Sequence, residues 1–370
     1  MKVLFIGDAS NMHNTLATAL RAKGHQAVVI SDGSRWMNTP RDIDLSRGSG
    51  MGGAIKYGID LLRLLPQMRG YDVVELAGQI FLPLKPDKLR WIFKYLKRHN
   101  GKIVLSALNT DYVYYSACMD GKTYRYSDFL IGSEPSPYAC SEEYKEKQAD
   151  NWGKPFMRRH SDFILSHIDG AAACLYEYYL AYRPLLGERL IHAGLPIDTD
   201  ALTFRPVTEV PQKVRFFIGI QRDRAVVKGA DRLLAALQRV CQRYPDRAEA
   251  VVAESVPYAD YCRMMRNSHV ILDQLYSYTP GTNALIAMAQ GLVAVSGAEP
   301  EYYNFIGEHD NRPIVNVSPL TEGDIEEKLI QIIGRKDELP EWAQRSRAFV
   351  ERHNSAAIVA QRYLEFWNSL

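Results

Sequence analysis

Short apolar runs alternate with segments of helical spacing along most of the chain. A continuous apolar run predicts a strand buried on both faces, whereas apolar residues three and four positions apart predict an amphipathic helix. In the first half the expected strands are 3–6, 27–30, 72–76, 102–106, 170–174 and 190–192, and the expected helices are 12–23, 55–65, 86–99 and 176–182. This alternation implies a parallel sheet with helices on both faces.

A second series follows a polar stretch at 198–211. Its expected strands are 214–220, 250–253, 270–272 and 292–296, and its expected helices are 230–243, 258–266, 282–290 and those from 321 onward. Because 370 residues exceed what one hydrophobic core usually supports, we expect two domains. The predicted class is α/β, with two tandem doubly wound, Rossmann-like domains that face a cleft, where such sheets bind ligands.

The domain boundaries are placed where the alternation of expected strands and helices is interrupted. We expect an N-terminal domain at 1–205, a C-terminal domain at 206–350, and a helix at 351–370 that packs back toward the N-terminal domain. An insertion near 110–169 is rich in tyrosine. Its rings could offer faces to a sugar or could fill the core of an irregular subdomain, and the sequence leaves both open.

Composition excludes several classes of protein. With 46% apolar and 24% charged residues the chain can build packed interiors, so long disordered tracts are not expected. The 45 Lys and Arg against 43 Asp and Glu give a net charge of +2, which provides no general attraction to nucleic acid.

The five cysteines are widely spaced and lack metal-binding patterns, so we expect reduced thiols, no metal and a cytoplasmic location. We see no leader peptide and no apolar stretch long enough to cross a bilayer.

The first strand and turn do not carry the three-glycine fingerprint of dinucleotide-binding proteins. Asn11 and His13 nevertheless lie where the first loop of such a sheet would face a ligand. They are candidates for acceptor binding, and an ordinary helix start explains them equally well.

Two cations follow the strand at 214–220. Arg222 and Lys228 lie on the loop between that strand and the next helix, where they could clamp a diphosphate. The alternative is a solvated surface pair.

The segment 276–283 precedes an apolar helix. Thr279 suits the N-cap and Pro280 the first helical position, while Gly281 would let a ligand approach the backbone. The amides of Gly281, Thr282 and Asn283 could then bind an anion at the helix N-terminus. Many helix starts need the same residues without binding anything.

These segments resemble a known family. The run 217–219 with Arg222 and Lys228, the run 270–275 and the run 287–296 look like the donor-site segments of GT-B glycosyltransferases, particularly glycosyltransferase family four. The runs 24–29 and 194–198 are also similar to its pattern.

The resemblance implies transfer from a nucleoside-diphosphate sugar, UDP- or GDP-linked, to a glycan or lipid-linked acceptor in cell-surface polysaccharide biosynthesis, with retention and without a metal. Arg222 and Lys228 would neutralise the leaving diphosphate with help from the Gly281, Thr282 and Asn283 amides. Asp111 would contact the acceptor or the sugar. The remaining donor-side candidates are Gly219, Glu254, Tyr278 and Glu299.

One departure from the family pattern concerns its pair of donor-site glutamates. Tyr278 and Ile286 occupy those positions, so the ribose would be held by Glu299 or Glu301, or the site is altered. Two alternatives therefore remain: a nucleotide-sugar-binding protein without transferase activity and a GT-B-fold nucleotide-sugar epimerase.

The expected helix 86–99 is strongly basic and carries Trp91 and Tyr95 beside its apolar stripe. It could rest on anionic lipid at the inner face of a membrane, a possible peripheral contact. The simpler interpretation is a helix that packs its stripe on the sheet and exposes its charges.

Overall fold

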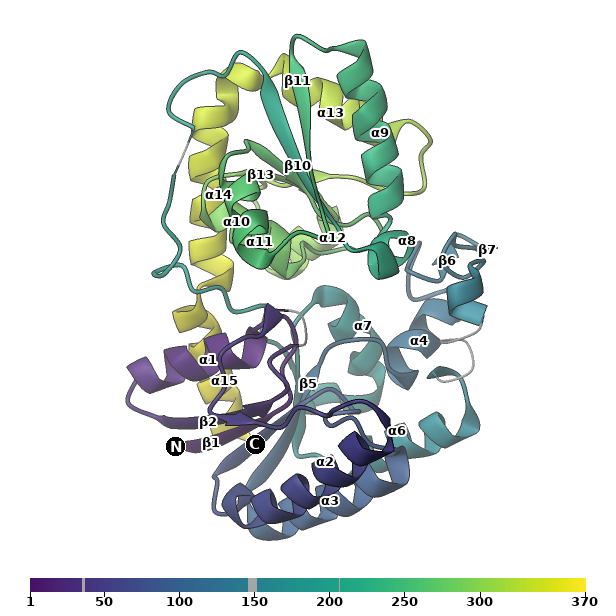
Figure 1. Ribbon diagram of the computed structural model, residues 1–370, viewed down its shortest axis with the longest axis vertical. Helices are drawn as coiled ribbons and strands as arrows, with labels where there is room; N and C mark the ends of the chain where they lie inside the picture. The colour runs from purple at the N-terminus through teal and green to yellow at the C-terminus, as the bar shows by residue number, and fades with distance from the viewer. Residues whose placement is uncertain (35–36, 146–151, 206) are drawn as a thin grey trace. The chain divides into compact units, whose positions relative to one another are not determined.

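The computed structural model describes residues 1–34, 37–145, 152–205 and 207–370 (Figure 1). The chain forms two compact units, each assembled from separate stretches of sequence. Unit 1 comprises Met1–Ser116, Ala149–Pro196 and Ala356–Leu370, and unit 2 comprises Ala117–Gln148 and Ile197–Ser355. Both contain a parallel sheet, which confirms the predicted α/β architecture with two Rossmann-like domains.

Unit 1 is built on a sheet of seven described strands in the order β3-β2-β1-β4-β5-β8-β9. Each neighbouring pair is parallel. Because helices cover both faces, the central strands are buried and consist mostly of apolar residues. The strands are β1 (Lys2–Ile6), β2 (Gln26–Ser31), β3 (Ile43–Asp44), β4 (Val73–Ala77), β5 (Lys102–Ala107), β8 (Gly170–Ala173) and β9 (Leu190–His192).

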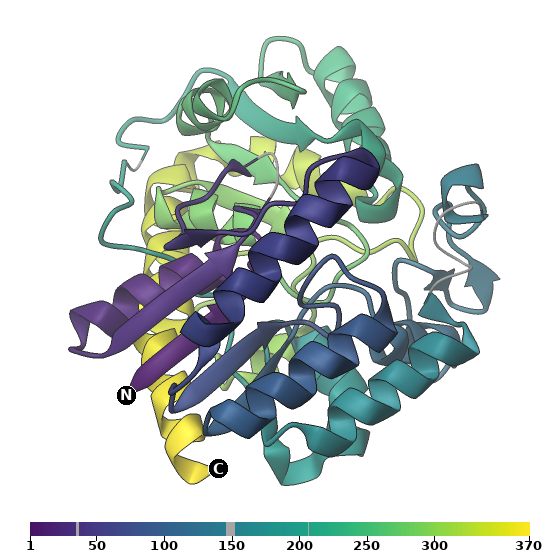
Figure 2. The same ribbon diagram turned by 60° about the horizontal axis from the view of Figure 1, so that its bottom comes forward.

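The helices of unit 1 cover the sheet in two groups. Helices α2 (Gly50–Leu64), α3 (Pro86–His99) and α6 (Pro155–His167) lie together on one face (Figure 2). Helix α1 (Met12–Ala22) packs against α15 (Ala356–Ser369), and both contribute to a core that includes β1 and β4. The other helices are α4 (Tyr112–Met119), which runs into unit 2, and α7 (Tyr176–Leu186), and short 3-10 turns follow α2 (Leu65–Met68) and α7 (Gly187–Arg189).

Unit 2 is built on a sheet of five described parallel strands in the order β11-β10-β12-β13-β14. They are β10 (Val214–Ile220), β11 (Ala248–Glu254), β12 (Val270–Leu272), β13 (Val293–Ser296) and β14 (Val315–Asn316). Its helices are α8 (Ala225–Lys228), α9 (Ala230–Arg243), α10 (Tyr258–Arg266), α11 (Thr282–Ala289), α12 (Pro300–Phe305), α13 (Asp324–Gly334) and α14 (Leu339–Asn354), with 3-10 turns at Arg222–Arg224 and Lys336–Glu338.

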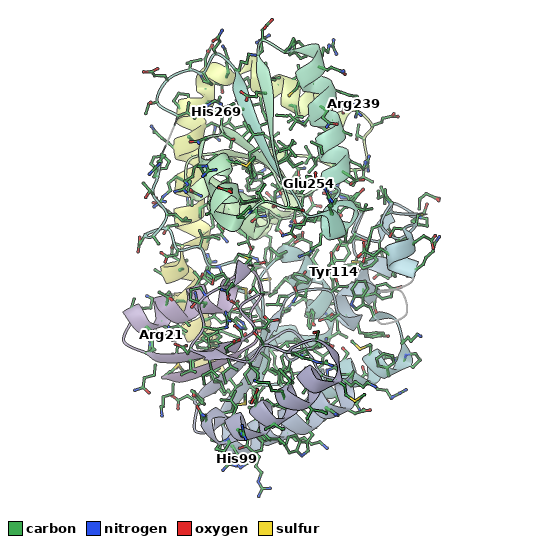
Figure 3. All side chains as sticks on the ribbon, viewed as in Figure 1. Arg21, His99, Tyr114, Arg239, Glu254 and His269 are labelled. Carbon is green, nitrogen blue, oxygen red and sulfur yellow. The ribbon has the colours of Figure 1, made fainter. Side chains whose placement is uncertain are left out.

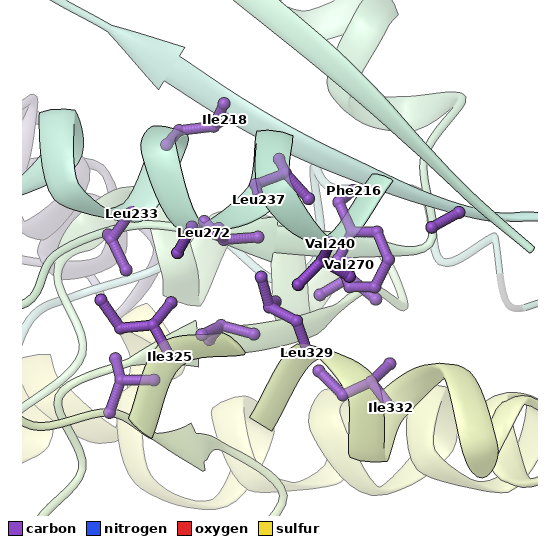
Figure 4. Close-up of a cluster of buried hydrophobic side chains, with 14 of the residues drawn as sticks. Phe216, Ile218, Leu233, Leu237, Val240, Val270, Leu272, Ile325, Leu329 and Ile332 are labelled. Atoms are coloured by element: carbon purple, nitrogen blue, oxygen red, sulfur yellow. The ribbon is translucent and has the colours of Figure 1, made fainter. Parts of the chain in front are cut away.

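The core of unit 2 explains why α9 and α13 form where they do. Leu233, Leu237 and Val240 recur at helical spacing on α9 and pack against Leu329 and Ile332 of α13 and against the sheet (Figure 4). Each of these side chains is almost fully buried. Helices α9 and α13 therefore form a packed layer on one face of the sheet of unit 2.

The tyrosine-rich region divides between the two units. Residues 117–145, with the antiparallel pair β6 (Leu130–Ile131) and β7 (Glu134–Pro135), pack with unit 2, whereas the sequence-based boundaries placed them in the domain 1–205. The difference arises from contacts between residues distant in sequence, which are described below. Helix α15 belongs to unit 1.

Candidate functional site

The loop after β10 places Lys228 at the end of α8. Gly229 follows with φ of 69°, and a Cβ at this position would lie 2.7 Å from the Leu275 Cβ, so glycine permits the close turn into α9. The Lys228 ammonium is half-buried and forms no hydrogen bond or ion pair within the described residues. Burial lowers its pKa, Asp273 opposes this shift and Arg224 adds to it. An unpaired, partly desolvated cation is suited to binding an anion.

Asp273 lies directly after β12, and its charge acts on Lys228. Its Oδ2 accepts a hydrogen bond from the Gly281 amide at 3.1 Å. Burial raises the pKa of Asp273, and the charge of Lys228 and the amides of Gly281 and Ala284 oppose that shift. A carboxylate of the chain thus occupies part of the helix N-terminus that the sequence suggested for a ligand.

The start of α11 differs from the sequence-based prediction. The prediction of Thr279 as N-cap and Pro280 as first helical residue is wrong, because the helix begins at Thr282 and Gly281 is the N-cap. Asp273 supplies the capping carboxylate from the neighbouring strand end, so no local side chain is needed. The amides of Thr282 and Asn283 donate no hydrogen bond within the part of the chain that the structure describes.

Arg222 follows the end of β10, and Glu254, labelled in Figure 3, is the last residue of the adjacent strand β11. Arg222 Nε donates to Glu254 Oε1 at 2.6 Å, and 77% of the Arg222 side chain is exposed. The two cations expected to clamp a diphosphate therefore differ in burial and in pairing. Arg222 is ion-paired on the surface, whereas Lys228 is unpaired and half-buried within the described residues.

Gly219, another donor-side candidate, is required by packing within unit 2. A Cβ on Gly219 would lie 2.5 Å from Cε2 of Tyr261 on α10. The ring of Tyr261 also contacts Phe217, with ring centroids 5.0 Å apart. Glycine at this position lets α10 approach β10 closely.

A segment that sequence reasoning did not connect with this unit lies over Tyr278. We call residues 124–126 the strap. The ring of Tyr126 stacks on Tyr278 with centroids 4.8 Å apart, and the Arg125 amide donates to the Tyr278 hydroxyl at 2.6 Å. Tyr278, at the position of the first family glutamate, thus holds the strap. Ile286, at the second, is half-buried.

Glu299 anchors the strap through hydrogen bonds from Arg125 and Tyr126. It is buried, and it accepts hydrogen bonds from the Arg125 guanidinium at 2.7 Å, the Tyr126 hydroxyl at 2.6 Å and Asn316 Nδ2 at 3.2 Å. Burial opposes ionisation, but these donors outweigh it and hold the Glu299 pKa below its usual value. Glu301 forms a second ion pair with Arg125 at 2.6 Å. Both glutamates suggested for a ribose are bonded to the strap.

In unit 1, Asp111 follows β5 and is buried. Its carboxylate accepts a hydrogen bond from the Tyr182 hydroxyl and another from the Tyr114 amide at 3.0 Å. Gln79, after β4, donates to the same Tyr182 hydroxyl at 2.9 Å. Burial raises the pKa of Asp111 to about 6 against these hydrogen bonds. Two strand ends therefore meet in a polar cluster, as expected of a parallel sheet.

The two acceptor candidates near the first strand are placed differently. His13 has no exposed surface, and its ring nitrogens lie 2.8 Å from the Gly7 carbonyl and 2.9 Å from the Ser106 hydroxyl. Burial lowers its pKa to about 4, so the ring is neutral near pH 7. Asn11 precedes α1 with φ of 65° and bonds Thr15 and Asn14 locally. In this structure both side chains hold the start of α1.

Sequence reasoning also missed Glu75, which lies inside strand β4. Its carboxyl group lies 2.7 Å from the Ser106 hydroxyl and accepts a hydrogen bond from Trp367 Nε1 at 3.2 Å. Burial raises its pKa to about 8. A glutamate interrupting an apolar strand, as in Val73-Val74-Glu75-Leu76, is the sequence signal that identifies it.

Neither a metal site nor a membrane span is found in the described residues. No group of three or more His, Cys, Asp or Glu side chains is arranged to hold a metal ion among them. No helix within the described ranges is both long and apolar enough to cross a bilayer.

Two doubly wound parallel α/β units in tandem define the GT-B class of fold. The structure is similar to sucrose-phosphate synthase from Thermosynechococcus elongatus (TM-score 0.64, 12% identity, 100% of this chain and 99% of that one). It is also similar to HepE from Anabaena, solved with UDP and glucose (0.60, 12%, 100% of both chains). A third similar structure is that of a proposed UDP-N-acetylglucosamine 2-epimerase from Listeria monocytogenes (0.55, 10%, 98% and 94%).

Comparison of the sequence with models of protein families and with curated proteins yields no match. The structural similarities establish that the chain has the GT-B fold.

Proposed function

We propose that the chain is a glycosyltransferase that moves a sugar from a nucleoside-diphosphate sugar, UDP- or GDP-linked, to a glycan or lipid-linked acceptor. The reaction would be retaining and metal-independent, in cell-surface polysaccharide biosynthesis. The observation that carries the proposal is Lys228, a half-buried ammonium without a hydrogen bond or ion pair in the described residues. It lies at the ligand-binding edge of a sheet in a GT-B fold, and HepE was solved with UDP at 100% coverage of both chains.

The mechanism follows from the charges at this edge. When the bond between sugar and diphosphate breaks, negative charge develops on the leaving phosphate, and Lys228 would stabilise it. The charge of Asp273 opposes the lowering of the Lys228 pKa, which offsets part of the cost of burying the ammonium. The Thr282 and Asn283 amides would add donors, and Arg222 would exchange Glu254 for a phosphate oxygen. An acceptor hydroxyl then attacks the anomeric carbon on the face that the diphosphate leaves, and its proton passes to the departing phosphate oxygen.

Ligand-induced stabilisation tests the donor site. A ligand that binds only the folded protein raises its melting temperature. We therefore screen UDP, GDP, ADP and CMP, and we expect one of the three nucleoside diphosphates to raise the melting temperature. Lys228→Ala should weaken that binding by about 1.5–3 kcal/mol, the value of a charged hydrogen bond. The matched control is Lys328→Ala, another half-buried lysine, on α13.

The outcomes separate the candidates. Unchanged affinity in Lys228→Ala contradicts the proposed donor site, and transfer of labelled sugar to an acceptor supports the enzyme. A nucleotide-sugar-binding protein would bind the donor without turnover. The alternative function as a nucleotide-sugar epimerase is supported by the similar fold of the Listeria structure. Conversion of the donor to an isomeric nucleotide sugar without acceptor would identify that activity.

A further inference from the structure

Helix α2 exposes an apolar row to solvent. Met51, Ile55, Ile59 and Leu62 are 81%, 59%, 44% and 59% exposed. They are spaced by four, four and three residues, which places them on one face of the helix. We call these four residues the α2 row. Single exposed apolar residues are ordinary, but a continuous row along a helix marks an interaction surface.

The opposite face of α2 accounts for its packing in unit 1. Tyr57, Leu61 and Leu64 are buried against the unit. Helical periodicity puts these three residues about half a turn from the α2 row. The row therefore points away from the sheet, and the fold of unit 1 does not explain it.

The neighbouring helix α3 adds positive charge and an aromatic ring on the same side. Lys88, Lys94, Arg98 and Trp91 are exposed, whereas Leu89, Ile92, Phe93 and Leu96 of α3 are buried. The Tyr95 hydroxyl donates to the Leu65 carbonyl at 2.9 Å, which ties α3 to the turn that ends α2. Because α2 and α3 cover the same face of the sheet, their outer faces look in the same direction (Figure 2).

We propose that the outer face of α2 and α3 docks on the surface of a membrane that contains anionic lipid. In this arrangement the α2 row and the Trp91 ring enter the boundary between head groups and acyl chains, and the α3 cations bind the head groups. The basic helix was the expected contact, and the structure adds the apolar component that lies on α2. The proposal extends beyond glycosyl transfer and does not depend on it.

Charge favours a lipid surface over a second copy of the chain or a protein partner. Lys56 on α2 is neutralised by Asp60, and Asp87 on α3 lies 3.7 Å from Arg90, so the acidic residues of both helices are paired. The adjacent helix α6 exposes Arg158 and Arg159 as well. This face concentrates positive charge on a chain whose net charge is only +2. Two such faces would repel each other, whereas anionic lipid would attract them.

Vesicle sedimentation with the full chain tests the proposal. We expect binding to phosphatidylcholine vesicles that contain about a third phosphatidylglycerol, and weaker binding to phosphatidylcholine alone. The double variant Ile55→Ser/Leu62→Ser should lose roughly tenfold or more in binding, because two large apolar side chains no longer leave water. The control Leu185→Ser removes a leucine on α7 that is 55% exposed, close to the 59% of Leu62, and should bind as the wild type does.

Two further measurements locate the contact. Lys88→Glu/Lys94→Glu should lower binding to anionic vesicles by roughly tenfold and leave neutral vesicles unaffected. Brominated lipid should quench tryptophan fluorescence in the wild type and not in Trp91→Phe. Absence of vesicle binding, or equal loss in Leu185→Ser, would overturn the proposal. So would a stable dimer that Ile55→Ser/Leu62→Ser converts to monomer, since a second copy would then cover the α2 row.

Discussion

Glu75 has no exposed surface, and its neighbours show how it avoids a buried charge. The His13 nitrogen that contacts the Gly7 carbonyl must carry the ring proton, so the other nitrogen of the neutral ring accepts a hydrogen bond from the Ser106 hydroxyl. The Ser106 oxygen can then accept a hydrogen bond from a protonated Glu75 carboxyl group, 2.7 Å away. A neutral carboxylic acid completes the chain, in agreement with a pKa raised to about 8 by burial.

Protonation of Glu75 makes the stability of the protein depend on pH. The pKa rises from 4.5 in the unfolded chain to about 8 in the fold, so the folded state holds more protons between these values. Stability should therefore fall as pH rises from about 4.5 to about 8. Glu75→Gln preserves a donor and an acceptor without an ionisable group. We expect chemical denaturation to show similar stability at pH 5 and a gain of about 3–5 kcal/mol over wild type at pH 9.

The control for this prediction is Asp72→Asn. Asp72 lies in the same region of unit 1 and is exposed, and its carboxylate accepts a hydrogen bond from the Lys2 amide. The Asp72→Asn substitution should leave the dependence of protein stability on pH between 4.5 and 8 unchanged. A Glu75→Gln protein that keeps the wild-type slope would show that Glu75 is ionised in the fold.

At the scale of elements, hydrogen bonds and an ion pair join the strap to Glu299 and Glu301 at the start of helix α12. Three donors converge on Glu299, whereas Glu301 receives Arg125 at an exposed position. The two glutamates are two residues apart and share one partner. Comparison of the two glutamates therefore measures how burial changes the contribution of an ion pair to stability.

We expect Glu299→Gln to destabilise unit 2 by about 1–3 kcal/mol, because the amide cannot accept all three hydrogen bonds at a buried site. Glu301→Gln should change stability by less than about 1 kcal/mol, since exposed ion pairs contribute little. Chemical denaturation gives both values, and hydrogen exchange of residues 124–126 should speed up only in Glu299→Gln. Equal effects of the two substitutions would mean that Glu299 is not the anchor of the strap.

The predictability of each element depended on whether its determinants were local. Strands such as β1 and β10 were evident because both of their faces are buried. The two-residue strand β3 gives no such pattern, and the glycines at the start of α2 hid its first turn. The α11 cap and the strap anchor, Asp273 and Glu299, depend on residues that only the folded chain brings together. Lys228 was proposed from its place in the loop, but its lack of a partner in the described residues was visible only in three dimensions.

At the scale of the whole molecule, the chain leaves unit 1 after Pro196 and returns to it at Ala356. The returning helix α15 completes the core of unit 1. Trp367 has no exposed surface, contacts Phe5 with ring centroids 6.3 Å apart, and donates to Glu75. Lys102 Nζ also donates to the Trp367 carbonyl at 2.5 Å. Unit 1 therefore depends on residues that are distant in sequence from β1 and β4.

This connectivity predicts that unit 1 is destabilised by changes at the far end of the chain. Trp367→Ala should cost about 3–5 kcal/mol through the cavity that it leaves. Trp91→Ala, at an exposed position on α3, should cost less than about 0.5 kcal/mol. In thermal unfolding followed by hydrogen exchange, Trp367→Ala should weaken protection of β1 and β4 while β10 and β12 in unit 2 stay protected. Equal loss in both sheets would show that the two units unfold as one, and α15 would then stabilise the molecule rather than unit 1 alone.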